Sequence, residues 1–311
     1  MDQIKVFAPA SVANVAVGYD ILGFAIHGPG DEVVVRYSDS PGLHITAITG
    51  TGEKKLPLEA KKNTAGYAAL QLLKSLGKED LGIEMEIHKK MPFGSGLGSS
   101  AASAAAGVFA VNELLGQPLN KQELLRFAVE GEQIADGAFH ADNVGPSLLG
   151  GILFIRDNES LDVQQLPVPD NLYAAVVYPD VEILTKHSRN ILSKDNTLKQ
   201  TITQTGNLGG FIIGLYQDDL SLVSRSLKDV IIEPQRAKLI PHFYDVKATA
   251  LQSGALGFSI SGAGPSVFAL CEGKSTAQKV GSAMQAIFLK QQIKANLFVS
   301  TINTDGAKRL K

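Results

Sequence analysis

Runs of β-branched residues, separated by proline and glycine, open the chain and predict short strands at Ile4–Ala8, Glu32–Tyr37 and His44–Ile48. Over Ile83–His88 apolar and polar residues alternate, which is the period-two pattern of a half-buried strand. Later apolar runs predict the remaining strands, at Ile152–Arg156, Tyr173–Tyr178, Phe258–Ser261, Ser266–Cys271 and Leu297–Ser300. Strands in short groups of this kind favour antiparallel pairing.

Longer segments between these strands predict helices, and one of them begins with a capping box formed by Asn120 and Glu123. The predicted helices are Thr64–Leu76, Ala101–Leu115, Asn120–Asp136, Thr197–Tyr216, Pro241–Gln252 and Ser275–Lys290. Because helices separate antiparallel-looking strand groups, the predicted fold class is α+β. The proline-containing stretch Leu166–Asn171 follows the strand near residue 155, and we predict two domains, residues 1–155 and 156–311.

The 311 residues are 44% hydrophobic and 19% charged, with a net charge of −2, which is the profile of a globular protein. The sequence has no basic stripe, so no nucleic acid partner is expected. Because the sequence runs directly into a predicted strand, we expect no signal peptide, and no apolar run is long enough to span a bilayer. We therefore expect no membrane partner and a cytoplasmic location. The single cysteine, Cys271, lies in an apolar run and is predicted to be a buried thiol rather than a nucleophile.

A glycine-rich segment joins a predicted strand to a predicted helix, and residues 92–103 read Pro-Phe-Gly-Ser-Gly-Leu-Gly-Ser-Ser-Ala-Ala-Ser. In this arrangement backbone N–H groups and the helix N-terminus attract phosphate, and the glycines let the backbone approach it. The spacing is neither that of a Walker A loop nor that of a dinucleotide fingerprint. Spacing alone leaves a phosphate-binding loop and a plain tight turn as alternatives. Ser99 and Ser100 at the helix start favour the first.

This segment resembles the phosphate loop of the GHMP kinases, a superfamily of ATP-dependent small-molecule kinases. Ala8–Asn14 (Ala-Pro-Ala-Ser-Val-Ala-Asn) and Ser261–Ser266 (Ser-Gly-Ala-Gly-Pro-Ser) resemble the N-terminal and C-terminal motifs of the superfamily. The resemblance implies the GHMP kinase fold, with a mixed N-terminal sheet like ribosomal protein S5 domain 2 and a ferredoxin-like C-terminal domain. It places these residues at the ATP: Asn63, Lys89, Pro92, Gly94, Ser95, Gly96, Leu97, Gly98, Ser99, Ser100, Ala101 and Ser103.

Glu132 falls on the apolar face of the capped helix, in register with Leu125 and Val129. A buried carboxylate needs a cation, although a carboxylate at the edge of the stripe can reach water instead. The resemblance implies that Glu132 binds the Mg²⁺ that bridges the ATP phosphates. The second implied metal ligand is Ser100, with Ser99 as the alternative.

Four segments extend the resemblance to the homoserine kinase family within the superfamily: Asn14–Gly23, His140–Val144, Thr185–Arg189 and Glu233–Arg236. Taken singly, their polar residues also have structural explanations, as turn, loop or surface groups. The resemblance implies that Arg189 and Arg236 bind a substrate carboxylate and that Asp20 meets its ammonium group. The implied substrate residues are Asn14, Asp20, His140, Asn143, Thr185, Arg189 and Arg236, and the implied catalytic residues are Asn14, Glu132 and Asn143.

Two positions depart from the family pattern. Ser188 stands where alanine is more usual, and Tyr19 stands where phenylalanine is more usual. Neither change removes a polar contact, so neither alters the substrate that we expect.

The implied reaction is ATP-dependent phosphorylation of the hydroxyl of L-homoserine, a step of threonine biosynthesis. Asp142 is the one candidate for a general base after the Glu132 helix, and we expect transfer by positioning without a dedicated base. The alternatives are another GHMP kinase, such as a mevalonate kinase, and a non-catalytic nucleotide-binding regulator on the same fold. The family pattern also implies a homodimer.

Overall fold

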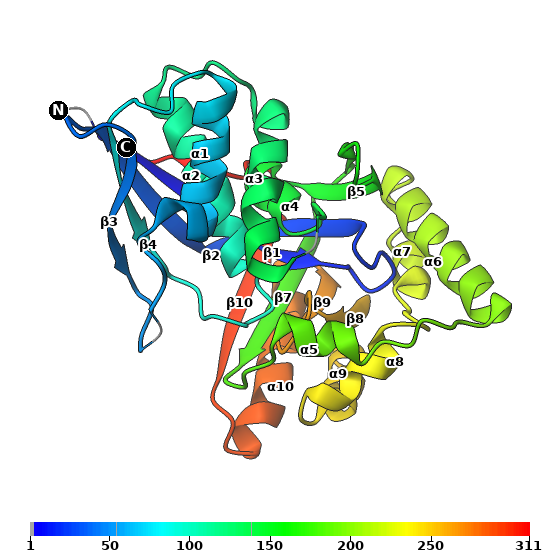
Figure 1. The fold of residues 1–311 in the computed structure, drawn as a ribbon. Coiled ribbons are helices and arrows are strands. Elements are labelled where there is room, and N and C mark those ends of the chain that lie inside the picture. Colours follow the sequence, from blue (N-terminus) through cyan, green and yellow to red (C-terminus); the bar gives the residue numbers. More distant parts are fainter. Residues whose placement is uncertain (1–2, 54, 138) are drawn as a thin grey trace.

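The computed structural model describes residues 3–53, 55–137 and 139–311. Two β-sheets carry the fold (Figure 1). The first sheet consists of β1 (Gln3–Ala13), β2 (Leu22–Tyr37), β3 (Leu43–Thr49), β4 (Ile83–His88), β5 (Ile152–Asp157), β6 (Asp162–Leu166) and β11 (Lys308–Arg309). Its order is β11-β1-β2-β4-β3, and β5 pairs with β2 and β6. The β3–β4 pair is parallel and the other pairs are antiparallel, so the sheet is mixed, as expected.

The helices of this half are α1 (Thr64–Ser75), α2 (Ser99–Leu114), α3 (Lys121–Asp136) and α4 (Val144–Leu149). Helix α2 lies against β1 and β2, with α1 and α3 beside it. A Cβ atom at Gly107 would come within 2.6 Å of the Ala65 carbonyl oxygen in α1, so the small residues of α2 are what allow this close packing. The predicted capping box of α3 is present, with the Asn120 side chain accepting from the Glu123 amide at 3.0 Å.

The second sheet consists of β7 (Leu172–Pro179), β8 (Gly257–Ile260), β9 (Val267–Glu272) and β10 (Ala295–Thr301). All its pairs are antiparallel and its order is β10-β7-β9-β8. Counted along the chain this order is 4-1-3-2, the ferredoxin-like arrangement that was expected. The helices of this half are α5 (Thr185–Asn190), α6 (Leu198–Tyr216), α7 (Leu220–Ser226), α8 (Glu233–Arg236), α9 (Phe243–Gln252) and α10 (Lys274–Lys290).

Helices α9 and α10 pack on the second sheet, where Phe243, Phe258 and Phe288 are buried in one apolar core. Cys271 lies in the same core, and burial raises the pKa of its thiol to about 12. The predicted core thiol is therefore confirmed. Among the described residues, we find no helix that combines the length and the apolar character needed to cross a membrane.

The chain leaves the first sheet after Leu166, enters the second at Leu172, and returns to the first at β11. The predicted division between residues 155 and 156 falls inside β5, and the division by residue number stays a prediction. Strands β6 and β11 were not predicted, because each is an edge strand with mostly polar or partly exposed residues and no apolar alternation.

Candidate active site

The glycine-rich segment forms a loop between β4 and the first turn of α2. Gly94, Gly96 and Gly98 have positive φ angles of 59°, 75° and 67°, a conformation that favours glycine. A Cβ atom at Gly96 would lie 2.5 Å from the Ser261 carbonyl oxygen, and one at Gly98 would lie 2.2 Å from the Ser11 Oγ. Close approach and backbone conformation therefore both require glycine at these two positions.

Two hydroxyl groups at this loop point to a ligand. Within the described part of the chain, the buried Oγ atoms of Ser95 and Ser99 have no hydrogen-bond partner. Both residues line a cavity. A buried polar group without a partner costs about 1–3 kcal/mol, so such groups call for an explanation. A plain tight turn gives none, whereas a phosphate provides acceptor oxygens.

The three motifs of the sequence meet at this loop. The Ser11 amide donates to the Leu97 carbonyl at 3.1 Å, and the Ser261 hydroxyl donates to the Gly96 carbonyl at 2.6 Å. The Ser11 hydroxyl donates to the Asn143 side chain at 2.9 Å. Segments from both ends of the chain therefore fix the loop conformation and bring Asn143 to it.

Ser100 and Glu132 lie together at the N-terminus of α2. The Ser100 hydroxyl donates to Glu132 Oε1 at 2.6 Å, and both residues line the cavity. Hydroxyl and carboxylate oxygens are hard donors of the kind that Mg²⁺ prefers. The residues present therefore fit a magnesium ion at the mouth of the loop. Since Ser100 contacts Glu132, the geometry favours Ser100 over Ser99 as the second oxygen donor.

Lys89 lies beneath the loop in a buried network. Its ammonium group pairs with Asp31 and donates to the Ser99 carbonyl at 2.7 Å and to the Ser103 hydroxyl at 2.8 Å. Burial lowers the pKa of Lys89, although the charge of Asp31 opposes the change. Asp31 was missed by sequence reasoning, because it stands beside Glu32 just before the predicted strand, and nothing in the sequence distinguishes one of these two acidic residues from the other.

Two arginines and an aspartate form the second part of the site. Arg189 donates to both carboxylate oxygens of Asp20, at 3.0 and 3.1 Å, in the bidentate geometry of a strong pair. The Tyr19 hydroxyl accepts from Arg189 at 3.0 Å and from Arg236 at 3.2 Å. Burial and the Asp20 charge raise the pKa of Tyr19, so its ring stays a neutral phenol. Tyr19 thus holds two like-charged guanidinium groups side by side.

A strained turn positions Asn14 next to this cluster. Asn14, Val15 and Ala16 have positive φ angles of 70°, 42° and 59°. Each non-glycine residue in this conformation costs roughly 1–2 kcal/mol, so the surrounding structure must hold the turn in place. Asn14 does part of this, since its side chain accepts from the Asp20 amide at 3.0 Å and donates to the Gly262 carbonyl at 2.9 Å.

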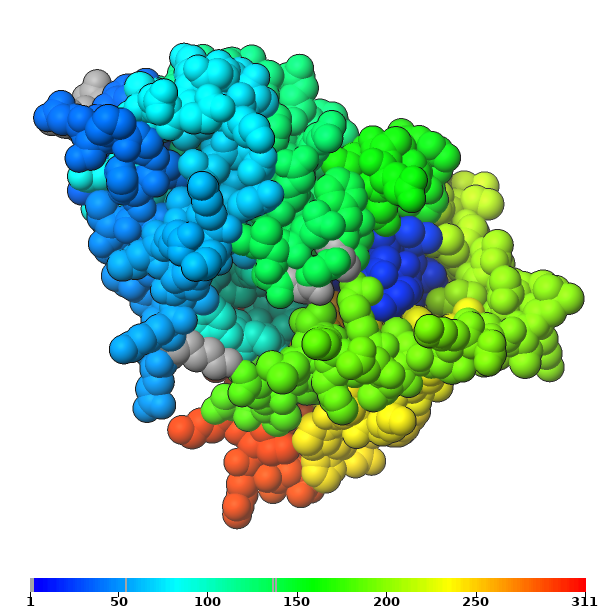
Figure 2. Space-filling model, viewed as in Figure 1, coloured from blue at the N-terminus to red at the C-terminus, as the bar shows by residue number. Residues whose placement is uncertain are grey.

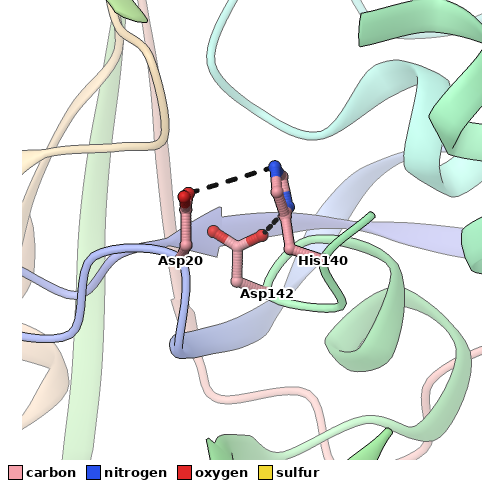
Figure 3. Close-up of side chains that lie close together, drawn as sticks. All are labelled: Asp20, His140 and Asp142. Carbon is pink, nitrogen blue, oxygen red and sulfur yellow. Dashed lines mark hydrogen bonds and ion pairs between the residues drawn. The ribbon is translucent and has the colours of Figure 1, made fainter. Parts of the chain in front are cut away.

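His140 joins the cluster from the loop after α3 (Figure 3). Its Nδ1 lies 2.7 Å from Asp142 Oδ1, and its Nε2 lies 3.9 Å from Asp20 Oδ1 and also contacts Arg189. Burial lowers the pKa of His140, but Asp142 and Asp20 outweigh it and raise the pKa to about 9. Arg189 can donate a hydrogen bond to His140 only where Nε2 is unprotonated, so this contact requires the neutral imidazole ring. The carboxylates favour the charged ring at neutral pH.

The group Asp20, His140 and Asp142 has atoms close enough to hold a metal ion. The Arg189 guanidinium already contacts Asp20 and His140 there. A protein cation therefore fills the position that a metal would take, and this cluster does not fit one.

One cavity of about 620 Å³ connects the phosphate loop with this cluster. Figure 2 shows the surface hollowed there, between the cyan part of the chain and the light-green segment that includes α5. The predicted residues that line it are Asn14, Asp20, Asn63, Lys89, Gly94, Ser95, Gly96, Gly98, Ser99, Ser100, Ser103, Glu132, His140, Asn143, Thr185, Arg189 and Arg236.

Three predicted nucleotide residues, Pro92, Leu97 and Ala101, do not line the cavity. The side chains of Leu97 and Ala101 are buried in the apolar core, so only their backbone could serve a phosphate. Asn63 lines it while its side chain caps α1. Sequence reasoning missed the lining residues Leu56, Pro57 and Lys62, which lie in the loop and the short 3-10 helix (Ala60–Lys62) before α1, because this segment shows no periodic pattern.

Comparison with known proteins identifies the family. The model of the GHMP kinases N terminal domain matches residues 63–151, and that of the GHMP kinases C terminal domain matches residues 203–290. Homoserine kinases from two strains of Chlorobium phaeobacteroides are 46% and 47% identical, over 99% and 100% of this chain and of their own length. The crystal structure of homoserine kinase from Cytophaga hutchinsonii is 53% identical, covers 100% of this chain and 98% of that one, and superposes with a TM-score of 0.97. The chain therefore belongs to the GHMP kinases and, within them, to the homoserine kinase family.

Proposed function

We propose that the protein transfers the terminal phosphoryl group of ATP to the side-chain hydroxyl of L-homoserine and so serves threonine biosynthesis. The observation that supports the proposal is one continuous cavity, which has the glycine-rich loop on one side and the cluster of Asp20, Arg189 and Arg236 on the other. A phosphate donor and a zwitterionic acceptor can therefore meet in one cavity. The family membership supports the same reaction.

The ATP phosphates would lie against the loop, with the unpartnered hydroxyls of Ser95 and Ser99 and the N-terminus of α2 facing them. Ser100 and Glu132 would hold Mg²⁺, which supplies positive charge to the phosphoryl group during transfer. Glu132 binds no phosphate itself, since two negative groups would repel. Its expected role is limited to holding the metal.

The acceptor half suits an α-amino acid because it offers both charges. In the structure, Arg189 and Asp20 pair with each other. A zwitterion replaces that one pair by two, with its carboxylate on Arg189 and its ammonium on Asp20. Protonation of His140 favours the exchange, because a charged ring no longer accepts a hydrogen bond from Arg189. Arg236 also faces the cavity, and we assign it to the same carboxylate.

We propose that no side chain acts as a dedicated base. Asp142 is buried and engaged with His140 at 2.7 Å, which suits orienting that ring. Asn14 and Asn143 lie between the phosphate loop and the acceptor cluster, where amide groups can orient the acceptor hydroxyl. Positioning of this kind can supply much of the barrier reduction in phosphoryl transfer. If Asp142→Asn retained binding of ATP and homoserine but lost turnover entirely, this part of the proposal would be wrong.

The experiment that tests the function is coupled ADP release with Mg-ATP and a panel of acceptors: L-homoserine, mevalonate, shikimate, galactose and L-serine. Turnover confined to L-homoserine is expected. Turnover with mevalonate instead would keep the kinase and overturn the acceptor. ATP binding without turnover on any acceptor would favour a nucleotide-binding regulator. Glu132→Gln, which keeps size and removes charge, should lower kcat at least about a hundredfold while ATP still binds.

The family pattern also leads us to propose that two copies of the chain associate. The described residues include an exposed apolar surface on the second half of the chain that supports this, and it is treated next. The division of the chain into residues 1–155 and 156–311 remains a proposal about independent folding units.

A further inference from the structure

Helix α6 exposes several large apolar residues in addition to the apolar face that it buries through Phe211 and Leu215. In its N-terminal half, Gln200, Gln204 and Asn207 point inward and hydrogen-bond to backbone groups of other segments. The large apolar residues of this N-terminal half, Leu198 and Ile202, point outward and are 75% and 63% exposed. A surface helix normally buries its apolar face, so this arrangement indicates that another surface covers α6.

The exposed positions form one straight stripe. Leu198, Ile202, Ile213 and Tyr216 are the exposed large apolar residues of the helix. With 3.6 residues per turn they fall within about 60° of one another around the helix axis. The intervening positions near this stripe are Thr205, Gly206 and Gly209, and a Cβ atom at either glycine would meet nothing within 4 Å. The stripe is therefore apolar at both ends and flat in the middle, where a second helix can approach closely.

The stripe is also symmetric about its own centre. A twofold axis between residues 207 and 208 would place Ile202 opposite Ile213 of a second copy, and Gly206 opposite Gly209 of that copy. Isologous contacts of this type are the usual basis of homodimers. A partner of different sequence would have no reason to match this symmetry.

The charges at the two ends complement each other in the same arrangement. The exposed residues Lys194, Asp195 and Lys199 leave the N-terminal end of α6 with a net positive charge, and the exposed Asp218 lies just after its C-terminal end. Antiparallel packing of two α6 helices brings each basic end to the acidic end of the other copy. The helix dipoles add to this attraction, because they also run antiparallel.

We propose that two copies of the chain associate through the outward face of α6, packed antiparallel about a twofold axis near residues 207 and 208. The proposal rests on the homodimer proposed above and names its surface. Figure 1 shows α6 at the outer edge of the molecule, with α7 on its inner side. The helix is about 28 Å long at 1.5 Å per residue. One helix pair of this length buries less than the roughly 1,600 Å² of a standard interface, so the dimer should dissociate on dilution.

The surface is also connected to the active site. On its inward face the Gln204 amide donates to the Val17 carbonyl at 3.3 Å, in the loop that carries Tyr19 and Asp20. Association through α6 would therefore stabilise the helix on which the acceptor loop rests.

The test is sedimentation velocity of the full chain over a wide range of concentrations, with wild type and three variants. Ile202→Glu with Ile213→Glu places like charges opposite each other across the axis, and should raise the dimer dissociation constant about a hundredfold or more. Ile202→Lys with Ile213→Glu places opposite charges there and should restore the dimer. The matched control is Leu289→Glu on α10, where Leu289 is 52% exposed, and it should leave the dimer unchanged.

Each result has a definite meaning. A wild-type dimer that persists in the double glutamate variant would overturn the proposal, as would failure of the lysine–glutamate variant to restore association. A wild type that stays monomeric at all concentrations would overturn both the dimer and its surface. Turnover of L-homoserine by the same samples is measured separately. If the wild type does not turn over L-homoserine, the proposed kinase activity is refuted, but the proposed association through α6 is unaffected.

Discussion

Replacing Asp31 with asparagine would leave the Lys89 ammonium group buried beneath the phosphate loop without the carboxylate that it contacts. The side chain of Lys89 is 2% exposed and that of Asp31 is 0% exposed. Removing one partner of such a buried pair costs about 3–5 kcal/mol, because the remaining charge stays desolvated. A domain is stable by only about 5–15 kcal/mol, so the loss should be large and easily measured.

The way in which the loss of folding stability depends on pH provides a second, independent test of the prediction. Burial already lowers the pKa of Lys89 below its ordinary value of 10.5, and the Asp31 charge opposes this. Without that charge the pKa falls further, so the variant releases the proton at lower pH in the folded state. The unfolded state then binds more protons than the folded one, and folding stability rises with pH. The loss of stability relative to wild type should therefore be large at neutral pH and shrink as the pH approaches 10.5.

Equilibrium urea unfolding of wild type and Asp31→Asn, at neutral pH and near pH 10.5, measures both effects. The double variant Asp31→Leu with Lys89→Met replaces the pair with apolar groups of similar volume and should recover most of the lost stability. A loss of unfolding free energy below about 1 kcal/mol would refute the reasoning, because solvent-exposed ion pairs contribute no more than that. So would a double variant that is no more stable than the single one.

Three further predictions follow from the site. Gly98→Ala should weaken ATP binding, measured by calorimetry, and destabilise the fold, since φ is +67° and a Cβ would lie 2.2 Å from a serine hydroxyl. Gly116→Ala, where φ is +80° but nothing lies within 4 Å, controls for backbone strain alone. Arg189→Lys should raise the KM for L-homoserine about tenfold or more with little change in the KM for ATP, because lysine cannot form the bidentate pair; equal changes in both would contradict this role. The pKa of His140 is raised from 6.5 to about 9, so its protonated ring stabilises the fold below pH 6.5 and this contribution is lost as the pH rises through 9. The difference in unfolding free energy between wild type and His140→Gln should shrink over that range, and an equal difference at both ends would show that the ring does not titrate there.

The helices and strands were predicted from sequence signals whose residues lie within a few positions of one another along the chain. The capping box at Asn120 and the alternation over Ile83–His88 predicted their elements to within one or two residues. The edge strand Asp162–Leu166 was missed because its residues are mostly polar or partly exposed and show no apolar alternation. Periodicity thus determined the elements that bury an apolar face and missed those that do not.

By itself the sequence determined a glycine-rich loop followed by a helix start, because these are local properties, and the prediction that this loop binds phosphate came from the family resemblance. Family resemblance added the acceptor residues one by one, without saying how they contact each other. Only the tertiary structure decided that Asp20 pairs with Arg189, 169 positions away, and that Lys89 pairs with Asp31, 58 positions away. Such contacts depend on how the two sheets pack and on which loops meet, and no short-range pattern records a pairing between charges so far apart in the chain.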